Sequence, residues 1–187
     1  MRHRNEAILD IARALRLPLD DLPEFPPRHW IGIKQPGLIL RRGGDGPLLW
    51  SWAQWSIVPP GGMEPPAYPL NNARSDTLNG WPWKMLQRRR CLIPVSGFWE
   101  PEKPARAPSS APWFYNSMQD NGPLLVAGLW SDAPDPATGE IADGYTMVIG
   151  KANAATRLHD RMPAILGTDA ARRGLEPGPL PTEPLAL

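Results

Sequence analysis

Cysteine is almost absent from this 187-residue sequence, which contains only Cys91. One thiol excludes an internal disulfide, a cysteine zinc cluster and a Cys-x-x-Cys redox pair. No apolar run approaches the roughly 20 residues that a helix needs to cross a bilayer. The segment Met1 to Glu6 is charged and leads into an amphipathic stretch, not into the apolar core of a secretory signal. We therefore expect a cytoplasmic protein without disulfides or membrane spans.

The sequence also lacks an excess of positive or negative charge. The 20 Lys and Arg residues balance 19 Asp and Glu residues, and the formal net charge is +1. The sum of charges therefore does not predict nucleic-acid binding. Sixteen of the 20 basic residues are Arg, however, and the planar guanidinium suits bidentate phosphate contacts and stacking on rings. A local groove lined by Arg is compatible with these numbers, because the electrostatic footprint depends on how charge is distributed.

Turn-forming residues and tryptophan are abundant. The chain has 25 Pro, 17 Gly and 9 Trp. This Pro and Gly content predicts many turns, and the Trp residues predict a packed core or a stacking surface. The length fits one domain that spans residues 1–187.

The hydrophobic pattern predicts more strands than helices. Helical spacing of apolar residues predicts a helix over 6–17 that Pro18 ends, and a second, short helix is expected near 80–89. The expected strands are 30–33, 38–41, 48–58, 91–95, 113–115, 124–130 and 145–149, with a hairpin turn at 43–46. We expect exposed loops at 101–111 and 132–143, and a weakly held tail after Gly174.

Four groups of polar residues stand where these segments end. They are Asn72 with Arg74, the run Arg88 to Arg90, Glu100, and His159 with Arg161. By residue type alone, Asn72 suits a turn or a helix cap. The Arg run suits either solvent or contact with phosphate.

Glu100 and His159 are the candidates for proton transfer. Glu100 follows Phe98 and Trp99, and aromatic neighbours that exclude water would raise the pKa of its carboxyl group, as general acid–base chemistry requires. A histidine such as His159 titrates near neutral pH and can donate a proton. The alternatives are a solvated loop glutamate and a structural histidine in a turn. Cys91 opens an apolar strand, which predicts a buried, unreactive thiol.

Taken in order, four segments resemble the SOS response-associated peptidase (SRAP) family. They are 72–77 (Asn-Ala-Arg-Ser-Asp-Thr), 89–100, 127–130 (Ala-Gly-Leu-Trp) and 159–163 (His-Asp-Arg-Met-Pro). The stretch Trp55 to Pro59 is also similar to the family's Trp-Gly-Leu-Ile-Pro. Four ordered motifs are far more specific than one, and the similarity spans most of the chain.

The resemblance implies an α+β domain, mainly antiparallel strands in a barrel-like arrangement with a few short helices. It also implies a monomer that is associated with the nucleoid, needs no cofactor or metal, and binds single-stranded DNA containing an abasic site. In the family, the α-amine of an N-terminal Cys condenses with the sugar aldehyde and releases water. The thiol then adds to the imine carbon and closes a thiazolidine, so that the protein is crosslinked to DNA. Peptidase and lyase activities accompany this chemistry.

Residue roles follow from the same resemblance. Asn72 would orient the attacking terminus, Glu100 would transfer protons at the amine and the departing sugar oxygen, and His159 would help to open the sugar ring. Arg74, Arg90 and Arg161 would contact DNA, chiefly its phosphates.

The sequence departs from the family pattern at several positions. Residue 2 is Arg instead of Cys, Asp76 stands where Glu is common, and Pro101 replaces an aromatic that follows the glutamate. The front and the end of the chain look shortened. Two alternatives follow: a start further upstream supplies the Cys, or the protein is a non-catalytic single-stranded DNA binder. A third, a thiol peptidase using Cys91 and His159, would require a thiol embedded in a strand to be reactive.

Overall fold

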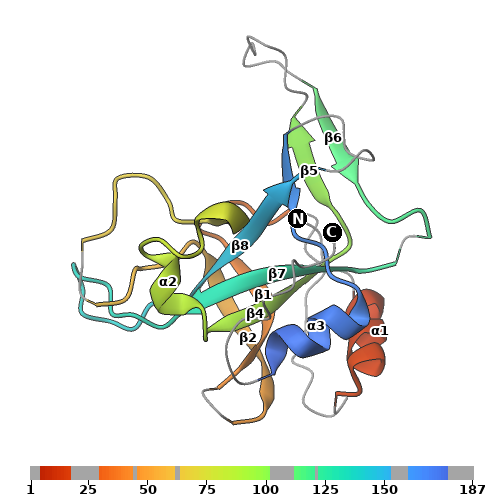
Figure 1. Ribbon diagram of the computed structural model, residues 1–187, viewed down its shortest axis with the longest axis horizontal. Helices are drawn as coiled ribbons and strands as arrows, with labels where there is room; N and C mark the ends of the chain where they lie inside the picture. The colour runs from red at the N-terminus through yellow and green to blue at the C-terminus, as the bar shows by residue number, and fades with distance from the viewer. Residues whose placement is uncertain are drawn as a thin grey trace.

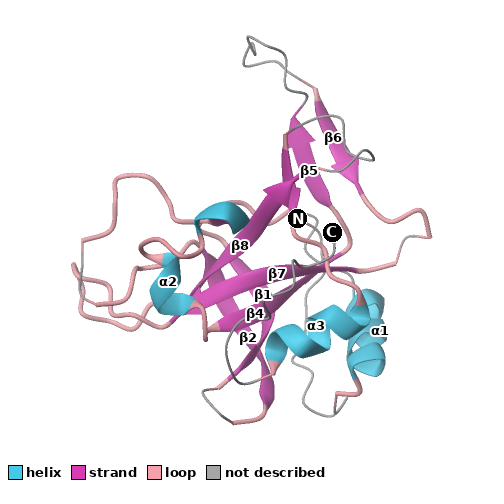
Figure 2. Ribbon diagram, viewed as in Figure 1, coloured by secondary structure: helices cyan, strands magenta, loops and turns pink. Residues whose placement is uncertain are grey.

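The computed structural model describes residues 5–17, 30–43, 46–61, 64–101, 112–120, 122–152 and 160–176. Within these ranges the architecture is α+β, with mostly antiparallel strands and a few short helices, as expected (Figure 2). The strands are β1 Pro36–Arg42, β2 Leu48–Trp55, β3 Asn72–Arg74, β4 Arg90–Val95, β5 Phe98–Pro101, β6 Trp113–Asn116, β7 Leu124–Ser131, β8 Gly144–Lys151 and β9 Arg161–Pro163. The helices are α1 Asn5–Leu15, α2 Trp83–Leu86 and α3 Thr168–Leu175, with a 3₁₀ turn at Ser75–Thr77.

Five of the strands close into a ring. The order is β2-β1-β4-β7-β8, and β2 returns to β8 through the parallel pairs Gln54↔Gly144 and Trp55↔Tyr145. The short strands β3 and β9 also pair with β8. The hairpin of β5 and β6 forms a separate two-stranded sheet that projects from the rest of the molecule (Figure 1). The barrel-like arrangement expected from the sequence therefore has a structural counterpart in this ring.

Successive side chains along each strand point to opposite faces of the sheet, and this alternation divides the core into two clusters. On β4, Leu92 joins one cluster, while Cys91 and Ile93 join the other. All five strands of the ring contribute buried residues to the second cluster, and among the described residues no helix does, which places this cluster on the inner face. The outer cluster contains Ile11 of α1 and Leu175 of α3. These two helices lie side by side and pack on β4 (Figure 1).

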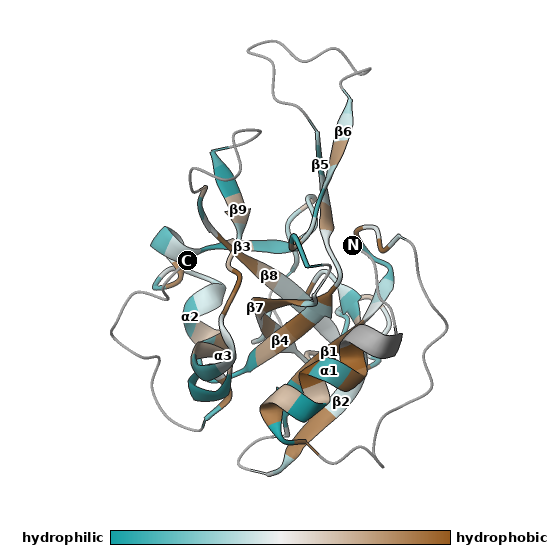
Figure 3. Ribbon diagram, turned by 90° about the vertical axis from the view of Figure 1, so that its right-hand side faces the viewer, coloured by the Kyte–Doolittle hydropathy of each residue, from teal (hydrophilic) through white to brown (hydrophobic). Residues whose placement is uncertain are grey.

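The apolar face of α1 explains why this segment is helical. Ile8, Ile11, Ala12 and Leu15 recur at helical spacing, and all four are buried. Brown, apolar segments are visible on both α1 and β4 (Figure 3). The predicted N-terminal helix is thus confirmed, and so is the short helix near 80–89, which is α2. No helix within the described ranges is both long and apolar enough to span a membrane.

Two strand predictions need correction. The segment 30–33 is not a strand, because Gln35 N–H donates to Gly32 O (3.1 Å) in a turn and Lys34 adopts the left-handed conformation (φ 64°). The strand expected over 48–58 ends at Trp55, since Ile57 N–H donates instead to Leu70 O (3.3 Å). The other expected strands are present.

The predicted loop at 132–143 is present, although Ala133 within it is buried. Of the loop predicted at 101–111, only Pro101 is described, and it ends β5. The turn at 44–45 and the tail from 177 onward lie outside the described residues. Leu175, the first residue of the tail that was expected to be weakly held, is instead buried in the outer cluster.

Candidate functional site

A pocket of about 400 Å³ lies where the ring meets the β5–β6 hairpin. Its walls come from segments far apart in the sequence: the turn before β1, the ends of β2 and β3, the hairpin, β8 and β9. The lining residues are Trp30, Ile31, Gly32, Ile33, Trp55, Asn72, Phe98, Trp99, Glu100, Trp113, Met147, Ile149, Arg161, Met162 and Pro163.

Strand β8 positions the polar residues of the pocket. On one side it pairs with β3 through Asn72↔Met147 and Arg74↔Ile149, and on the other with β9 through Lys151↔Arg161. The start of β3 is anchored by the carbonyl oxygen of Asn71, which accepts hydrogen bonds from the indole nitrogen Nε1 of Trp55 and from Met147 N–H, both at 2.9 Å. Segments separated by some 85 residues therefore present their side chains together.

Asp76 joins two arginines at the edge of the pocket. Arg74 donates from Nε and a terminal nitrogen to the two carboxylate oxygens, at 3.0 and 2.8 Å. Arg161 donates to one of the same oxygens at 3.0 Å. The hydrogen bonds from Arg74 and then Arg161 hold the pKa of Asp76 well below its usual range. The carboxylate therefore stays ionised and aligns both guanidinium groups.

The hairpin carries Glu100, which is half-buried in β5. The base of the hairpin is tight: a Cβ on Gly97 would overlap Asn116 O and the ring of Tyr115. The hydroxyl of Tyr115 also donates to Ser96 Oγ at 3.2 Å. Glycine at position 97 thus lets β5 and β6 approach closely enough to hold Glu100 at the pocket wall.

Three of the residues predicted from the sequence line this pocket, namely Asn72, Glu100 and Arg161. Arg74 does not line it but is connected to Arg161 through Asp76. His159, which the family resemblance makes a catalytic residue, lies outside the described residues. Its role stays a prediction, and β9 begins two positions later at Arg161.

Arg90, predicted to contact DNA, is placed elsewhere. Its Nε donates to Gly174 O at 2.6 Å, and another guanidinium nitrogen donates to Glu176 O. These are carbonyl groups at the C-terminal end of α3, where a positive charge is favourable. Arg90 is not among the residues that line the pocket. We therefore interpret it as an anchor for α3.

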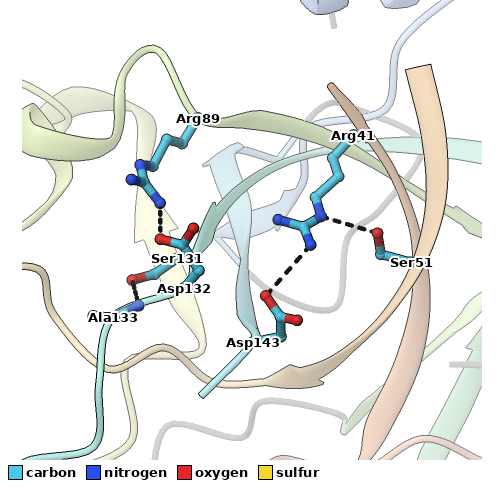
Figure 4. Close-up of polar contacts among 7 residues, drawn as sticks. All are labelled: Arg41, Ser51, Arg89, Ser131, Asp132, Ala133 and Asp143. Atoms are coloured by element: carbon cyan, nitrogen blue, oxygen red, sulfur yellow. Dashed lines mark hydrogen bonds and ion pairs between the residues drawn. The ribbon is translucent and has the colours of Figure 1, made fainter. Parts of the chain in front are cut away.

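Arg89, from the same basic run, also has a structural environment. It forms an ion pair with Asp132 (Figure 4). Its guanidinium carbon lies 4.8 Å from the ring centroid of Trp130. Arg41 approaches the same ring to 4.0 Å. It also contacts Asp143 at 3.4 Å and donates to Ser51 Oγ at 2.9 Å (Figure 4). Cation–π contacts and ion pairs thus fix the positions of Arg41 and Arg89 beside Trp130 of β7.

Cys91 is a core residue, as predicted. It lies on β4 with 2% of its surface exposed, in the inner cluster. Burial raises the pKa of its thiol far above the usual range. A thiolate at this position is therefore strongly disfavoured, which argues against a thiol peptidase based on Cys91.

The sequence analysis did not identify the aromatic wall of the pocket. Trp30, Trp99 and Trp113 all line it, with exposed fractions of 51%, 38% and 55%. The high Trp content indicated a stacking surface or a core, but it could not say which Trp residues meet. The pocket as a whole therefore combines an amide, a carboxylate, a guanidinium and exposed indole rings. Such groups are suited to a ligand that has both anionic and flat apolar parts.

The fold and the site define an α+β protein with a composite pocket beside a projecting hairpin. The family described as SOS response associated peptidase (SRAP) matches residues 3–186. The chain belongs to this SRAP family.

Curated relatives and a solved structure are consistent with this membership. The abasic site processing protein HMCES of Xenopus tropicalis is 29% identical over 153 residues, which are 70% of this chain and 46% of the relative. The abasic site processing protein YoqW of Bacillus subtilis strain 168 is 27% identical over 158 residues, which are 82% of this chain and 69% of the relative. A phage-related protein from Bordetella bronchiseptica superposes with a TM-score of 0.70 at 26% identity, covering 91% of this chain and 78% of that chain. The chain thus spans about half the length of the Xenopus relative.

Proposed function

We propose that the chain acts in the DNA damage response by binding single-stranded DNA at abasic sites in this pocket. The two relatives are named as abasic site processing proteins, which supports the same role here. Because its ligand would be DNA, we propose that the protein is located at the nucleoid in the cytoplasm. We also propose that it binds as a monomer, with one copy of the chain at each lesion.

One observation carries the proposal. The pocket brings Asn72, Glu100 and Arg161 together from three separate strands, and Asp76 joins Arg74 to Arg161 at its edge. Guanidinium groups form charge-assisted hydrogen bonds with phosphate oxygens. The carboxyl and amide groups would face the sugar, whose missing base leaves room in the pocket.

The covalent step depends on an N-terminal Cys, and two versions of the function follow. This sequence carries Arg2, and its one cysteine is the buried Cys91. An in-frame Met-Cys upstream of Met1 would supply the amine–thiol pair for crosslinking and the associated lyase and peptidase activity. Without such a segment, the protein is a non-catalytic binder that protects the lesion. The genomic sequence upstream of Met1 distinguishes the two versions.

Binding is tested with fluorescein-labelled oligonucleotides by anisotropy at several salt concentrations. We expect the protein to prefer single strands to duplex, with an affinity that falls as salt rises, because contacts with phosphate release counterions. The double variant Arg74→Ala, Arg161→Ala should bind all sequences more weakly, with a salt slope smaller by about 0.7 for each phosphate contact that is lost.

The matched control removes the same charge elsewhere. In Arg13→Ala, Arg173→Ala the two lost arginines are exposed residues of α1 and α3, and neither lines the pocket. This control should bind like the wild type. Equal binding by the wild type and the Arg74, Arg161 double variant would show that the pocket edge does not hold DNA.

A further inference from the structure

We propose that a second pocket, behind the end of β2, binds a small zwitterion of the α-amino acid class, with Lys34 holding its carboxylate and Asp135 its ammonium group. This pocket has a volume of about 240 Å³. Its walls come from the turn before β1, the end of β2, the Pro-rich segment 65–70 and the loop between β7 and β8. The inference goes beyond the proposed function and does not depend on it.

The second pocket is distinct from the composite pocket, although both adjoin the same strand. Trp55 lines the composite pocket, whereas its neighbours Gln54 and Ser56 line the second pocket. The turn before β1 divides in the same way, with Ile33 at the composite pocket and Lys34 at the second. Successive residues of an extended chain point to opposite sides. The two pockets therefore lie on opposite sides of this strand end and can take different ligands.

Two opposite charges flank the second pocket without neutralising each other. At the end of β2, Gln54 pairs with Pro36 of β1 on one side and with Gly144 of β8 on the other. Lys34 precedes β1 and Asp135 belongs to the loop before β8, so the two charges come from opposite sides of β2. Adjacent strands lie about 4.8 Å apart, which separates these flanks by about 10 Å. Within the described ranges neither residue forms an ion pair.

The backbone of Lys34 suggests that its side chain serves binding and not stability. Its φ of 64° lies in the left-handed region, which is costly for a residue with a Cβ and easy for glycine. The main chain is fixed there, since Lys34 N–H donates to Trp55 O and Gln54 Nε2 donates to Lys34 O, both at 2.9 Å. Glycine would keep these contacts with less strain. A lysine in such a position at a pocket wall points to a ligand.

The remaining lining selects a small zwitterion. A phosphate would meet the like charge of Asp135, and a simple cation would meet that of Lys34. The volume is below the roughly 300–1,000 Å³ of pockets for drug-sized ligands, so the occupant is small. The hydroxyl groups of Ser56 and Tyr68 can exchange hydrogen bonds with it. The prolines in the segment 65–69 offer an apolar wall to an aliphatic side chain, which makes L-leucine a suitable probe.

The test follows amide chemical shifts by NMR while isotope-labelled protein is titrated with millimolar L-leucine, L-leucinamide or N-acetyl-L-leucine. L-leucine should shift the amide signals of Gln54 and Ser56 in a saturable way. Leucinamide lacks the carboxylate and N-acetyl-leucine lacks the ammonium group. Each should therefore bind about two- to fivefold more weakly than L-leucine, as expected for the loss of one exposed ion pair.

Variants assign each charge of the ligand to one side chain. Lys34→Gln should remove the difference between L-leucine and L-leucinamide, and Asp135→Asn should remove the difference between L-leucine and N-acetyl-L-leucine. The asparagine retains an acceptor for Ala137 N–H, which donates to Asp135 Oδ1 at 2.8 Å. Lys34→Gly should bind like Lys34→Gln and should unfold at the same or a higher urea concentration, because glycine suits the φ of 64°.

Two controls alter charge elsewhere. Lys84 is exposed on α2 and lines neither pocket, so Lys84→Gln should bind L-leucine like the wild type. The double variant Arg74→Ala, Arg161→Ala changes the edge of the composite pocket and should also bind L-leucine normally.

Three results would overturn the amino acid site. They are the absence of a saturable shift with L-leucine, equal binding of either probe that carries one charge, and a difference between probes that persists in Lys34→Gln or Asp135→Asn. Shifts centred on the composite pocket, or binding lost in the Arg74, Arg161 double variant, would place L-leucine in that pocket and overturn the site as well. The anisotropy measurements with DNA test the proposed function separately.

Discussion

At the scale of single residues, the carboxylate of Asp76 organises the edge of the pocket. It accepts hydrogen bonds from Arg74 on β3 and Arg161 on β9, two strands that meet through β8. The Asp side chain is long enough to reach both guanidinium groups. Both arginines are thereby oriented before any ligand arrives, which lowers the entropic cost of binding.

Asp76→Asn should reduce stability in a pH-dependent way. The folded-state pKa of Asp76 is depressed, so its contribution is fully present above the unfolded-state pKa, about 3.9, and is lost as pH falls through the folded-state value. The difference in denaturation midpoint between wild type and Asp76→Asn should be constant from pH 7 to pH 5 and should shrink below about pH 4.

Urea unfolding at several pH values measures this difference. Asp169→Asn serves as the control, because the Asp169 side chain is 85% exposed and lies 4.0 Å from its partner Arg172. Its effect should be much smaller at every pH. A gap between wild type and Asp76→Asn that widens on acidification would contradict the assigned role of the carboxylate.

The buried thiol of Cys91 leads to a second prediction at this scale. The chain should form no heat-stable adduct with abasic single-stranded DNA, because Cys91 is 2% exposed and its thiol resists ionisation. An α-amine with a pKa near 8 can still form a reversible imine, so borohydride should trap a small amount of complex. Denaturing gels measure both products.

Adding an upstream Met-Cys segment should produce the stable adduct, and Glu100→Gln in that background should slow its formation. A durable crosslink from the 187-residue chain that disappears in Cys91→Ser would show that Cys91 is reactive after all.

At the scale of secondary-structure elements, two arginines hold α3 against the sheet. Arg90 donates to Gly174 O, and the Nε of Arg42 on β1 donates to Leu175 O at 3.1 Å. The carbonyl groups at a helix C-terminus lack partners within the helix, so these contacts satisfy them. The outer core cluster, which includes Ala171 and Leu175, depends on this docking.

Arg90→Ala should therefore lower the free energy of unfolding by about 1.5–3 kcal/mol, the usual range for hydrogen bonds to a charged group. Affinity for single-stranded DNA should not change. Arg90→Lys should recover part of the stability, because one ammonium group cannot reproduce the planar fork. Chemical denaturation and anisotropy measure the two properties separately. A variant with normal stability but weakened binding would return Arg90 to the DNA-contacting set.

Elements with a strong local pattern were predictable from the sequence, and those set by distant partners were not. The apolar spacing of α1 and the alternation in β4 and β7 are local signals. The strands β3 and β9 have three residues each and exist because β8 pairs with them. In α3 only Ala171 and Leu175 are fully buried, too few apolar positions for a periodic pattern.

The same distinction applies to the candidate site. The ordered family motifs made candidates of Asn72, Glu100 and Arg161, which line the pocket. A set of motifs in a fixed order can indicate that residues far apart in the sequence lie close together in the fold, whereas the type of a single residue cannot. The separation of Arg90 from this pocket depends on its contact with α3, a helix that was not predicted. The meeting of Trp30 with Trp113 depends on the β5–β6 register and could not be read from composition.

At the scale of the whole molecule, the ring and the β5–β6 hairpin form the pocket together, and no single stretch of the chain forms it alone. Its lining draws on segments from Trp30 to Pro163. Ile31, Phe98 and Met147 belong to the inner cluster and also line the pocket, so core packing and site geometry share side chains. A change in that cluster should therefore alter the shape of the pocket as well as the stability of the fold.

The closure of β2 onto β8 constrains the order in which the chain can fold. The pairs Gln54↔Gly144 and Trp55↔Tyr145 join distant parts of the sequence, whereas β1 and β2 pair as a local hairpin. Long-range pairing must offset a large loss of chain entropy, which makes it slow compared with the formation of local hairpins. Because β3 and β9 need β8 as their template, the candidate pocket matures late along the folding route. A nascent chain would thus acquire its local hairpins well before the pocket is complete.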